Sequence, residues 1–371
     1  MSQPDCDSLM MDRALKLARK GEGCVEPNPM VGCVIVKGGR IIGEGYHRRF
    51  GGPHAEVVAL GNCTRSPRGA TVYVSLEPCR HTGKTPPCTK ALIEAGVGEV
   101  VVAVADPNPQ VAGGGMRALR RAGVSVRSGI QRDSARSLLT PFLTRILSRR
   151  PYVIAKWAQS LDGKLATRTG QAQWISSEPS RKQVHRLRAR VDAVLVGAGT
   201  VLADDPLLTA RGVRIKRVAT RVVLDGRLRI PLDGRLASTA VGTPTLVLTT
   251  AARLRSRKAQ RLRKLGVEVG SVTARQGRLS LPACLRLLGR RDMTNLLVEG
   301  GGALLTSFLE QGLVDEALVY VAPIIVGDAR AVSVLPRRRT TRITDALRAR
   351  RVTSSRVGDD VRFRLQLTPI P

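Results

Sequence analysis

The chain has 371 residues, of which 61 are lysine or arginine and 29 are aspartate or glutamate, giving a formal net charge of +32. This length predicts two domains of roughly 150–200 residues each, and an apolar content of 43% excludes wholesale disorder. Aromatic residues make up only 3%, too few for the usual base-stacking surfaces, and no run of 18 uncharged apolar residues predicts a membrane span.

The first half of the chain alternates short helices and strands. Helical spacing of apolar residues predicts a helix over 9–19, capped by Asp7 or Ser8. A further helix is expected from Pro53, with proline in its first turn. The remaining expected elements are strands over 31–36, 40–45, 70–76, 100–105 and 124–126, and helices over 88–95, 116–122 and 134–150. This alternation predicts a three-layer α/β domain over residues 1–150.

A second α/β domain is expected over residues 151–371, starting with a strand over 152–157. Its other predicted strands are 191–196, 221–224, 245–248, 295–298, a segment near 317–325, and 361–367. Its predicted helices are 179–190, 252–265 and 303–311. Because no internal repeat links the halves, the chain is interpreted as a fusion of two different domains.

Histidine and cysteine gather in one part of the first half. One imidazole and two thiolates, from His54, Cys79 and Cys88, form a donor set that zinc prefers, and a fourth position left to water makes such a site catalytic. Both His54 and Cys88 begin predicted helices, and a helix N-terminus favours the thiolate form of Cys88. Glu56 is not needed as a ligand and can carry a proton of the activated water. The alternative is a packed core histidine beside buried, unreactive cysteines.

These residues resemble the cytidine-deaminase superfamily. The eight residues between Cys79 and Cys88, together with Pro27-Asn28-Pro29, are similar to the bacterial riboflavin-biosynthesis deaminases, which act on a pyrimidinone ribose phosphate. Segments 43–47 and 106–113 agree with this family, and Arg80 stands where a small polar residue is expected. The resemblance implies that the substrate is contacted by Asn28, His47, His81, Lys84, Asp106 and Asn108. Lys84, on a loop rich in glycine and proline, suits the phosphate as a point charge.

The residues of the second half indicate a function less specifically than the histidine and cysteine residues of the first half. Residues 298–302, Val-Glu-Gly-Gly-Gly, join a predicted strand to a predicted helix, where backbone N–H groups can hold a phosphate. A tight turn with no ligand is the alternative interpretation. His185, in a basic helical segment, is interpreted as a surface residue.

Segments 156–163, 173–176 and 196–211 resemble the riboflavin-pathway reductases, whose fold is dihydrofolate-reductase-like. The resemblance implies that NADPH is held by the turn over residues 301–307 and by residues elsewhere in this half. The residues named for this role are Ala158, Trp174, Thr200, Asp204, Gly301, Gly302 and Ala303. It implies that the sugar phosphate is held by Lys156, Arg188, Leu208, Arg211 and Glu299. Ala172 replaces an expected serine, which removes one hydrogen bond of about 0.5–1.5 kcal/mol.

Both resemblances in one chain predict a bifunctional, cytoplasmic enzyme of riboflavin synthesis. A Zn²⁺-dependent domain would remove the 2-amino group of a diamino-ribosylamino-pyrimidinone phosphate, and an NADPH-dependent domain would reduce the ribosyl group to ribityl. The expected partners are this small phosphorylated pyrimidine and further copies of the chain, with no nucleic acid and no membrane. Two alternatives remain: a tRNA- or DNA-editing deaminase with a basic RNA-binding half, and a non-enzymatic basic protein with a structural zinc, which would require four protein ligands.

Overall fold

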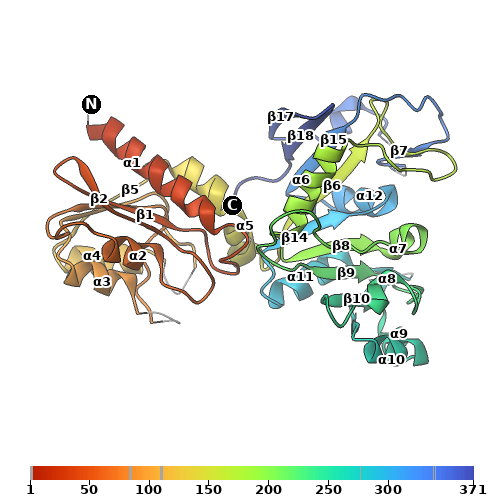
Figure 1. The fold of residues 1–371 in the computed structure, drawn as a ribbon, viewed down its shortest axis with the longest axis horizontal. Helices are drawn as coiled ribbons and strands as arrows, with labels where there is room; N and C mark the ends of the chain where they lie inside the picture. The colour runs from red at the N-terminus through yellow and green to blue at the C-terminus, as the bar shows by residue number, and fades with distance from the viewer. Residues whose placement is uncertain (1–2, 83–85, 109–111, 276, 337, 339) are drawn as a thin grey trace. The chain divides into compact units, whose positions relative to one another are not determined.

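The computed structural model describes residues 3–82, 86–108, 112–275, 277–336, 338 and 340–371. The chain divides into two compact units, called unit 1 (residues 1–149 with 370–371) and unit 2 (residues 150–369). Figure 1 shows that each unit is built around its own sheet with helices on it. Among the helices of the described residues, none combines the length and apolar character that crossing a bilayer requires.

Unit 1 contains a five-stranded sheet of order β2-β1-β3-β4-β5. Strand β1 pairs antiparallel with β2 and β3, whereas β3, β4 and β5 are parallel to one another. Its elements are α1 Gln3–Ala18, η1 Arg19–Gly21, β1 Gly32–Lys37, β2 Arg40–Tyr46, α2 Ala55–Gly61, β3 Thr71–Val74, α3 Cys88–Glu94, β4 Glu99–Val102, α4 Gly114–Arg121, β5 Ser125–Ser128 and α5 Arg132–Ser148.

Alternation along the strands places apolar side chains on both faces of the unit 1 sheet. Cys33 and Ile35 belong to a buried cluster with residues of α2, α3 and α4, while Val34 belongs to a second cluster with Met11 of α1. The sheet therefore lies between two helical layers, which is the three-layer α/β arrangement expected from the sequence (Figure 1).

Unit 2 contains a nine-stranded sheet of order β11-β10-β9-β8-β14-β6-β15-β18-β17. It is parallel from β11 to β15, and β18 and β17 add an antiparallel edge. Its strands are β6 Tyr152–Gln159, β7 Lys164–Ala166, β8 Ala193–Gly197, β9 Thr220–Leu224, β10 Thr245–Thr249, β11 Glu268–Ser271, β12 Ala274–Arg275, β13 Arg278–Leu279, β14 Asn295–Glu299, β15 Glu316–Val321, β16 Val332–Ser333, β17 Arg351–Val357 and β18 Asp360–Gln366. Its helices are α6 Glu178–Arg188, α7 Ala198–Asp204, α8 Arg235–Ser238, α9 Ala251–Leu254, α10 Arg257–Lys264, α11 Leu281–Arg290, α12 Gly302–Glu310 and η2 Ile343–Asp345.

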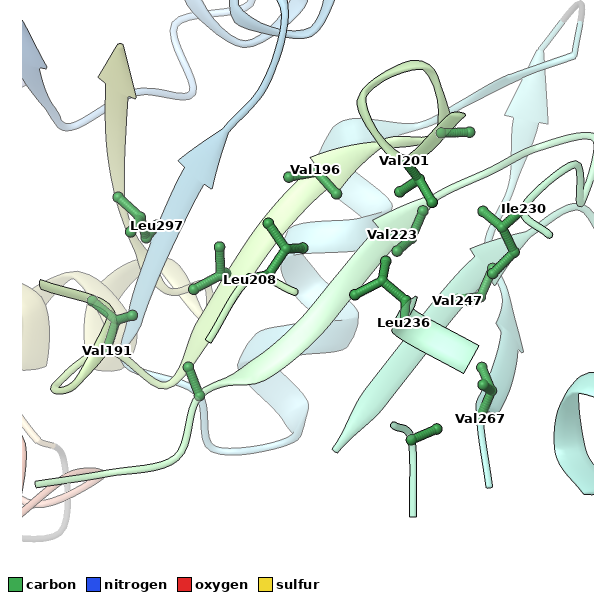
Figure 2. Close-up of a cluster of buried hydrophobic side chains, with 14 of the residues drawn as sticks. Val191, Val196, Val201, Leu208, Val223, Ile230, Leu236, Val247, Val267 and Leu297 are labelled. Carbon is green, nitrogen blue, oxygen red and sulfur yellow. The ribbon is translucent and has the colours of Figure 1, made fainter. Parts of the chain in front are cut away.

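Both faces of the unit 2 sheet are covered as well. Figure 2 shows one of the two clusters, in which Val196, Val223 and Val247 of neighbouring strands point the same way toward Val201 and Leu236. The alternate strand residues face a second cluster with α11 and α12. Burial on both faces explains why these parallel strands consist of nearly continuous apolar runs.

The expected starts of helices α1 and α2 are wrong. Helix α1 begins at Gln3, so Asp7 and Ser8 lie inside it rather than capping it. Their side chains make tertiary contacts instead: Asp7 accepts a hydrogen bond from the Tyr73 hydroxyl (2.7 Å), and Ser8 accepts one from Gln131 (2.8 Å). Helix α2 begins at Ala55, after Pro53, with His54 as its N-cap.

The helix expected over 252–265 is two helices, α9 and α10. They are separated at Ser256, whose hydroxyl caps α10 by accepting the Ala259 N–H (3.2 Å). The sequence interpretation also assigned no element to α7, α11 or β17. Helix α11 did carry a signal, because Leu281, Cys284 and Leu288 are buried at helical spacing.

Candidate active sites

Three segments of unit 1 bring the expected metal ligands together. His54 is the N-cap of α2, Cys88 is the first residue of α3, and Cys79 follows β3. Their ligand atoms lie within 4.8 Å of one another. His54 Nδ1 lies 3.2 Å from Cys88 Sγ and 3.6 Å from Cys79 Sγ. One nitrogen and two sulfur donors at this spacing fit a Zn²⁺ ion that keeps a further position open.

The pKa values of the two thiols are shifted in opposite directions. A hydrogen bond from the Cys88 thiol, helped by the backbone N–H of Cys88 and by His54, lowers the pKa of Cys79 to about 4. The same hydrogen bond, together with burial, raises the pKa of Cys88. The shared hydrogen bond therefore acts in opposite directions on the pKa values of the two thiols.

Glu56 lies in the first turn of α2 and is only 3% exposed. Burial raises the pKa of its carboxyl group to about 7, against the opposing effect of the His54 charge. A carboxyl group that titrates near neutrality can both accept and return a proton, which is the property expected of Glu56 from the sequence.

A cavity of about 340 Å³ opens at these residues. Its lining collects nearly all of the deaminase-site residues expected from the sequence, namely Asn28, His47, His54, Glu56, Cys79, His81, Asp106 and Asn108. Lys84 lies outside the described residues. The fully buried Cys88 is not part of the lining, so the cavity combines two of the three candidate metal ligands, His54 and Cys79, with side chains able to recognise a polar ring.

Hydrogen bonds define the state of His47 in this cavity. Its Nδ1 lies 3.0 Å from the Pro53 carbonyl, which can only accept, so Nδ1 carries the proton. Its Nε2 therefore accepts from the Asn28 amide nitrogen, 3.2 Å away. Burial lowers the pKa of His47, which favours this neutral form. Asn28 and His47 form one hydrogen-bonded unit at the wall of the cavity.

Asp106 and Asn108 form a second such unit. The Asn108 N–H donates to Asp106 Oδ1 at 2.9 Å, and burial raises the pKa of Asp106 to about 6. The sequence interpretation missed Glu77, Phe50 and Phe142, which also line the cavity. Glu77 is close to Cys79 in sequence, but Phe142 reaches the cavity from α5, and no sequence motif connects it to the site.

Unit 2 partly buries three of the charged residues expected to hold a sugar phosphate. Lys156 and Glu299 are neighbours on the paired strands β6 and β14, and Arg188 ends α6. Arg188 makes a forked ion pair with Glu299, with Nε–Oε1 and Nη2–Oε2 distances of 2.7 and 2.9 Å. Lys156 Nζ lies 3.9 Å from Glu299 Oε2. Arg188 Nη1 also donates to the Thr209 carbonyl oxygen at 3.3 Å, so the N–H groups that remain for a phosphate are one on Nη1 and one on Nη2.

These charged groups shift one another's pKa values. Burial alone would raise the pKa of Glu299, but Arg188 and Lys156 together lower it to about 2. Burial lowers the pKa of Lys156 in spite of Glu299. The cluster is therefore a paired set of charges with an excess of positive charge, as an anionic ligand requires.

His185 is not the surface residue that the sequence suggested. It is half-buried, and its Nδ1 accepts the backbone N–H of Arg211 at 3.3 Å. Burial, followed by the charges of Arg188 and Arg211, lowers the pKa of His185. This neutral histidine supports the segment that carries buried Leu208 and exposed Arg211, two of the expected substrate residues.

The residues expected to contact NADPH come from several strand ends. Thr200 and Asp204 lie on α7 directly after β8, and Gly301, Gly302 and Ala303 begin α12 directly after β14. Strands β8 and β14 are adjacent and parallel, so both turns lie at the same edge of the sheet. Ala158 lies on β6, the next strand. Trp174 precedes α6, is 70% exposed, and has the Arg181 guanidinium carbon 4.4 Å from its ring centroid.

Two family models match the chain. The model for the cytidine and deoxycytidylate deaminase zinc-binding region matches residues 4–104, and the model for the RibD C-terminal domain matches residues 151–363. The α/β fold class expected from the sequence, with a cytidine-deaminase-like domain followed by a riboflavin-pathway reductase domain, is confirmed.

Relatives match over almost the entire chain. The riboflavin biosynthesis protein RibD of Aquifex aeolicus (strain VF5) is 43% identical, covering 96% of this chain and 97% of its own. The structure of Acinetobacter baumannii RibD superposes with a TM-score of 0.88 at 37% identity, over 99% of this chain and 100% of its own. A Thermotoga maritima structure, described as a diaminohydroxyphosphoribosylaminopyrimidine deaminase/5-amino-6-(5-phosphoribosylamino)uracil reductase, gives a TM-score of 0.86 at 35% identity, with the same coverage.

Proposed function

Because the chain belongs to the RibD family of bifunctional riboflavin-biosynthesis deaminase/reductases, we propose that it catalyses both reactions named for the Thermotoga maritima protein. Unit 1 would deaminate diaminohydroxyphosphoribosylaminopyrimidine, and unit 2 would reduce 5-amino-6-(5-phosphoribosylamino)uracil. The observation that carries the proposal is the candidate metal site of His54, Cys79 and Cys88, two of whose members, His54 and Cys79, line one cavity together with Glu56.

In the deaminase, His54, Cys79 and Cys88 would hold Zn²⁺, which supplies Lewis-acid activation of water. Glu56 accepts a proton from the attacking water and returns it to the departing amino group, so that ammonia leaves. Asn28, His47, Asp106 and Asn108 recognise the pyrimidine and ribose by hydrogen bonds, and His81 lies at the exposed rim. Lys84 completes the proposed set as a contact for the phosphate.

In the reductase, NADPH supplies the hydride that converts the ribosyl group to ribityl. The strand-end residues on α7 and α12, with Ala158 and Trp174, are the proposed contacts of this cofactor. Arg211 and the remaining N–H groups of Arg188 are the proposed ligands of the substrate phosphate, and buried Leu208 is a further proposed contact of the substrate. Lys156 and Glu299, 3.9 Å apart, are the proposed contacts of the sugar, because an ammonium and a carboxylate group can hydrogen-bond to its hydroxyl groups.

The test supplies the diamino substrate with and without NADPH and identifies the products. Without NADPH we expect ammonia and the uracil product, and with NADPH we expect the ribityl product together with NADPH oxidation. Glu56→Gln should retain one zinc per chain but lose about 100-fold or more in ammonia release, because the proton carrier is removed. The same variant should still reduce the supplied uracil intermediate, and normal deamination by it would contradict the role of Glu56.

No feature of the described residues favours the two alternatives over this proposal. Salt-dependent binding of tRNA or single-stranded DNA, with a slope that indicates several phosphate contacts, would support the editing deaminase instead. The homo-oligomeric state and the cytoplasmic location stay predictions, and light scattering on the purified chain tests the first.

A further inference from the structure

Glu77 has no role in the reactions described above, yet it is 4% exposed and lines the deaminase cavity. We propose that Glu77 is a positioning residue of the deaminase, whose carboxylate holds the loop carrying Asp106 and Asn108 against the segment carrying Cys79. This inference rests on the proposed deaminase function, because it concerns how the substrate contacts of that reaction are held.

One carboxylate oxygen of Glu77 accepts hydrogen bonds from two residues, Asp106 and Gly113, which lie seven positions apart in the chain. Glu77 Oε2 accepts the backbone N–H of Asp106 at 3.2 Å and the backbone N–H of Gly113 at 3.0 Å. These two amides lie at the beginning and the end of the segment 106–113. By accepting both of them, a single oxygen fixes the distance between the two ends of the loop.

The other oxygen caps a helix. Helix α4 begins at Gly114, and its N-cap, Gly113, has no side chain to accept the free N–H groups of the first turn. Glu77 Oε1 accepts one of these, the N–H of Met116, at 3.0 Å. A carboxylate is favourable at this end of a helix, so α4 takes its cap from a residue 39 positions earlier.

Close packing joins the same helix to the metal-binding segment. A Cβ atom added to Gly115 would lie 1.9 Å from the Pro78 carbonyl oxygen, so the first turn of α4 rests directly on the backbone that leads into Cys79. The backbone N–H of Glu77 also donates to Val104 at the end of the neighbouring strand segment (3.0 Å). The carboxylate and these contacts hold the ligand segment, Asp106 and the first turn of α4 together.

The substrate contacts depend on this assembly more than the metal ligands do. Asn108 donates to Asp106, so a shift of Asp106 moves both side chains at the cavity wall. Cys79 has separate support, because it accepts the Cys88 N–H and lies beside His54. Loss of the Glu77 carboxylate should therefore weaken substrate binding while leaving the zinc in place.

The test compares Glu77→Gln and Glu77→Ala in the full chain loaded with zinc, using the diamino substrate. Glutamine keeps one carbonyl acceptor, whereas alanine removes all three hydrogen bonds. We expect KM to rise about 3- to 10-fold for glutamine and more than 10-fold for alanine. Both variants should keep kcat within about threefold and zinc at one per chain. Glu99→Gln is the matched control, since it removes a carboxylate paired with Arg127 on the same sheet, and its KM should be unchanged.

Reduction of the uracil intermediate by unit 2 serves as the internal standard for folded enzyme. The proposal is overturned if KM is unchanged in both variants, if glutamine is as impaired as alanine, or if zinc is lost. If the Glu77→Ala variant does not fold, the KM and the zinc content of the Glu77→Gln variant still test the proposal. A wild-type chain that does not deaminate the substrate refutes the proposed function instead, so the two failures are distinguishable.

Discussion

The Glu299 carboxylate shows how one largely buried side chain, 11% exposed, holds a charged cluster together in unit 2. It pairs with Arg188 by a forked pair of hydrogen bonds and lies near Lys156 on the adjacent strand. Removing one member of such a buried set leaves the others without a counter-charge, which is costly. The reductase site is consequently predicted to depend on the ionisation of this residue.

Glu299→Gln should lower the stability of unit 2 by about 3 kcal/mol near pH 7. The pKa of Glu299 is about 2 in the folded chain against an ordinary 4.5. Its stabilisation is therefore complete above about pH 4.5 and is lost as the pH falls toward 2. The difference between wild type and variant should shrink accordingly between pH 5 and pH 3.

Urea unfolding followed by tryptophan fluorescence measures this difference, because the two tryptophans, Trp157 and Trp174, both lie in unit 2. Glu268→Gln is the control, since Glu268 makes a similar fork with Arg291 but is largely exposed. It should cost under about 1 kcal/mol. An equal and pH-independent loss in both variants would rule out the buried network as the cause.

At the scale of elements, α4 contradicts ordinary helix propensity. Its first two residues are Gly114 and Gly115, although glycine costs about 1 kcal/mol relative to alanine inside a helix. The close approach of Gly115 to the Pro78 carbonyl explains this choice, because a methyl group cannot fit there. The two glycines lower the helix propensity of α4, but they allow its first turn to pack against the metal-binding segment.

Gly115→Ala should therefore destabilise unit 1 by about 1–3 kcal/mol and reduce deamination, although alanine is the better helix former. Gly61→Ala, at the end of α2, is the matched control, because nothing lies within 4 Å of its added Cβ atom. Ammonia release and zinc content measure the effect, with intermediate reduction by unit 2 as the standard. Full activity in Gly115→Ala would mean that the packing can relax.

At the scale of the whole molecule, the two units have separate cores, since each sheet carries its own apolar clusters on both faces. The candidate metal ligands all lie in unit 1, and the charged cluster around Glu299 lies in unit 2. Among the described residues, the net charge of +32 has a proposed use at a few positions, such as Arg188 and Arg211. Most of the remaining excess is unexplained by the structure.

Separate cores and separate sites predict that the two activities can be lost independently. Treatment with a zinc chelator should abolish ammonia release, while NADPH oxidation with the supplied uracil intermediate should stay within about twofold of the untreated rate. Added Zn²⁺ should restore deamination. Parallel loss of both activities on chelation would show that unit 2 needs the metal for its structure.

Much of this architecture was predictable because its signals are local. Continuous apolar runs predicted the strands β1, β8 and β14, and the spacing of His54, Cys79 and Cys88 predicted the candidate ligand set. The caps were less predictable: Asp7 has the right chemistry for an N-cap but is used for a contact with Tyr73. A short polar side chain can satisfy either partner, and only packing selects between them.

The sequence by itself determined the two-domain α/β organisation and the residue types of both candidate sites, because these depend on periodicity and on short motifs. Only the tertiary structure decided which side chains support them. Glu77 meets Gly113 across 36 positions, and His185 meets Arg211 across 26. Such contacts carry no local periodicity or motif, since they form only when strands and helices distant in the chain pack at one edge of a sheet.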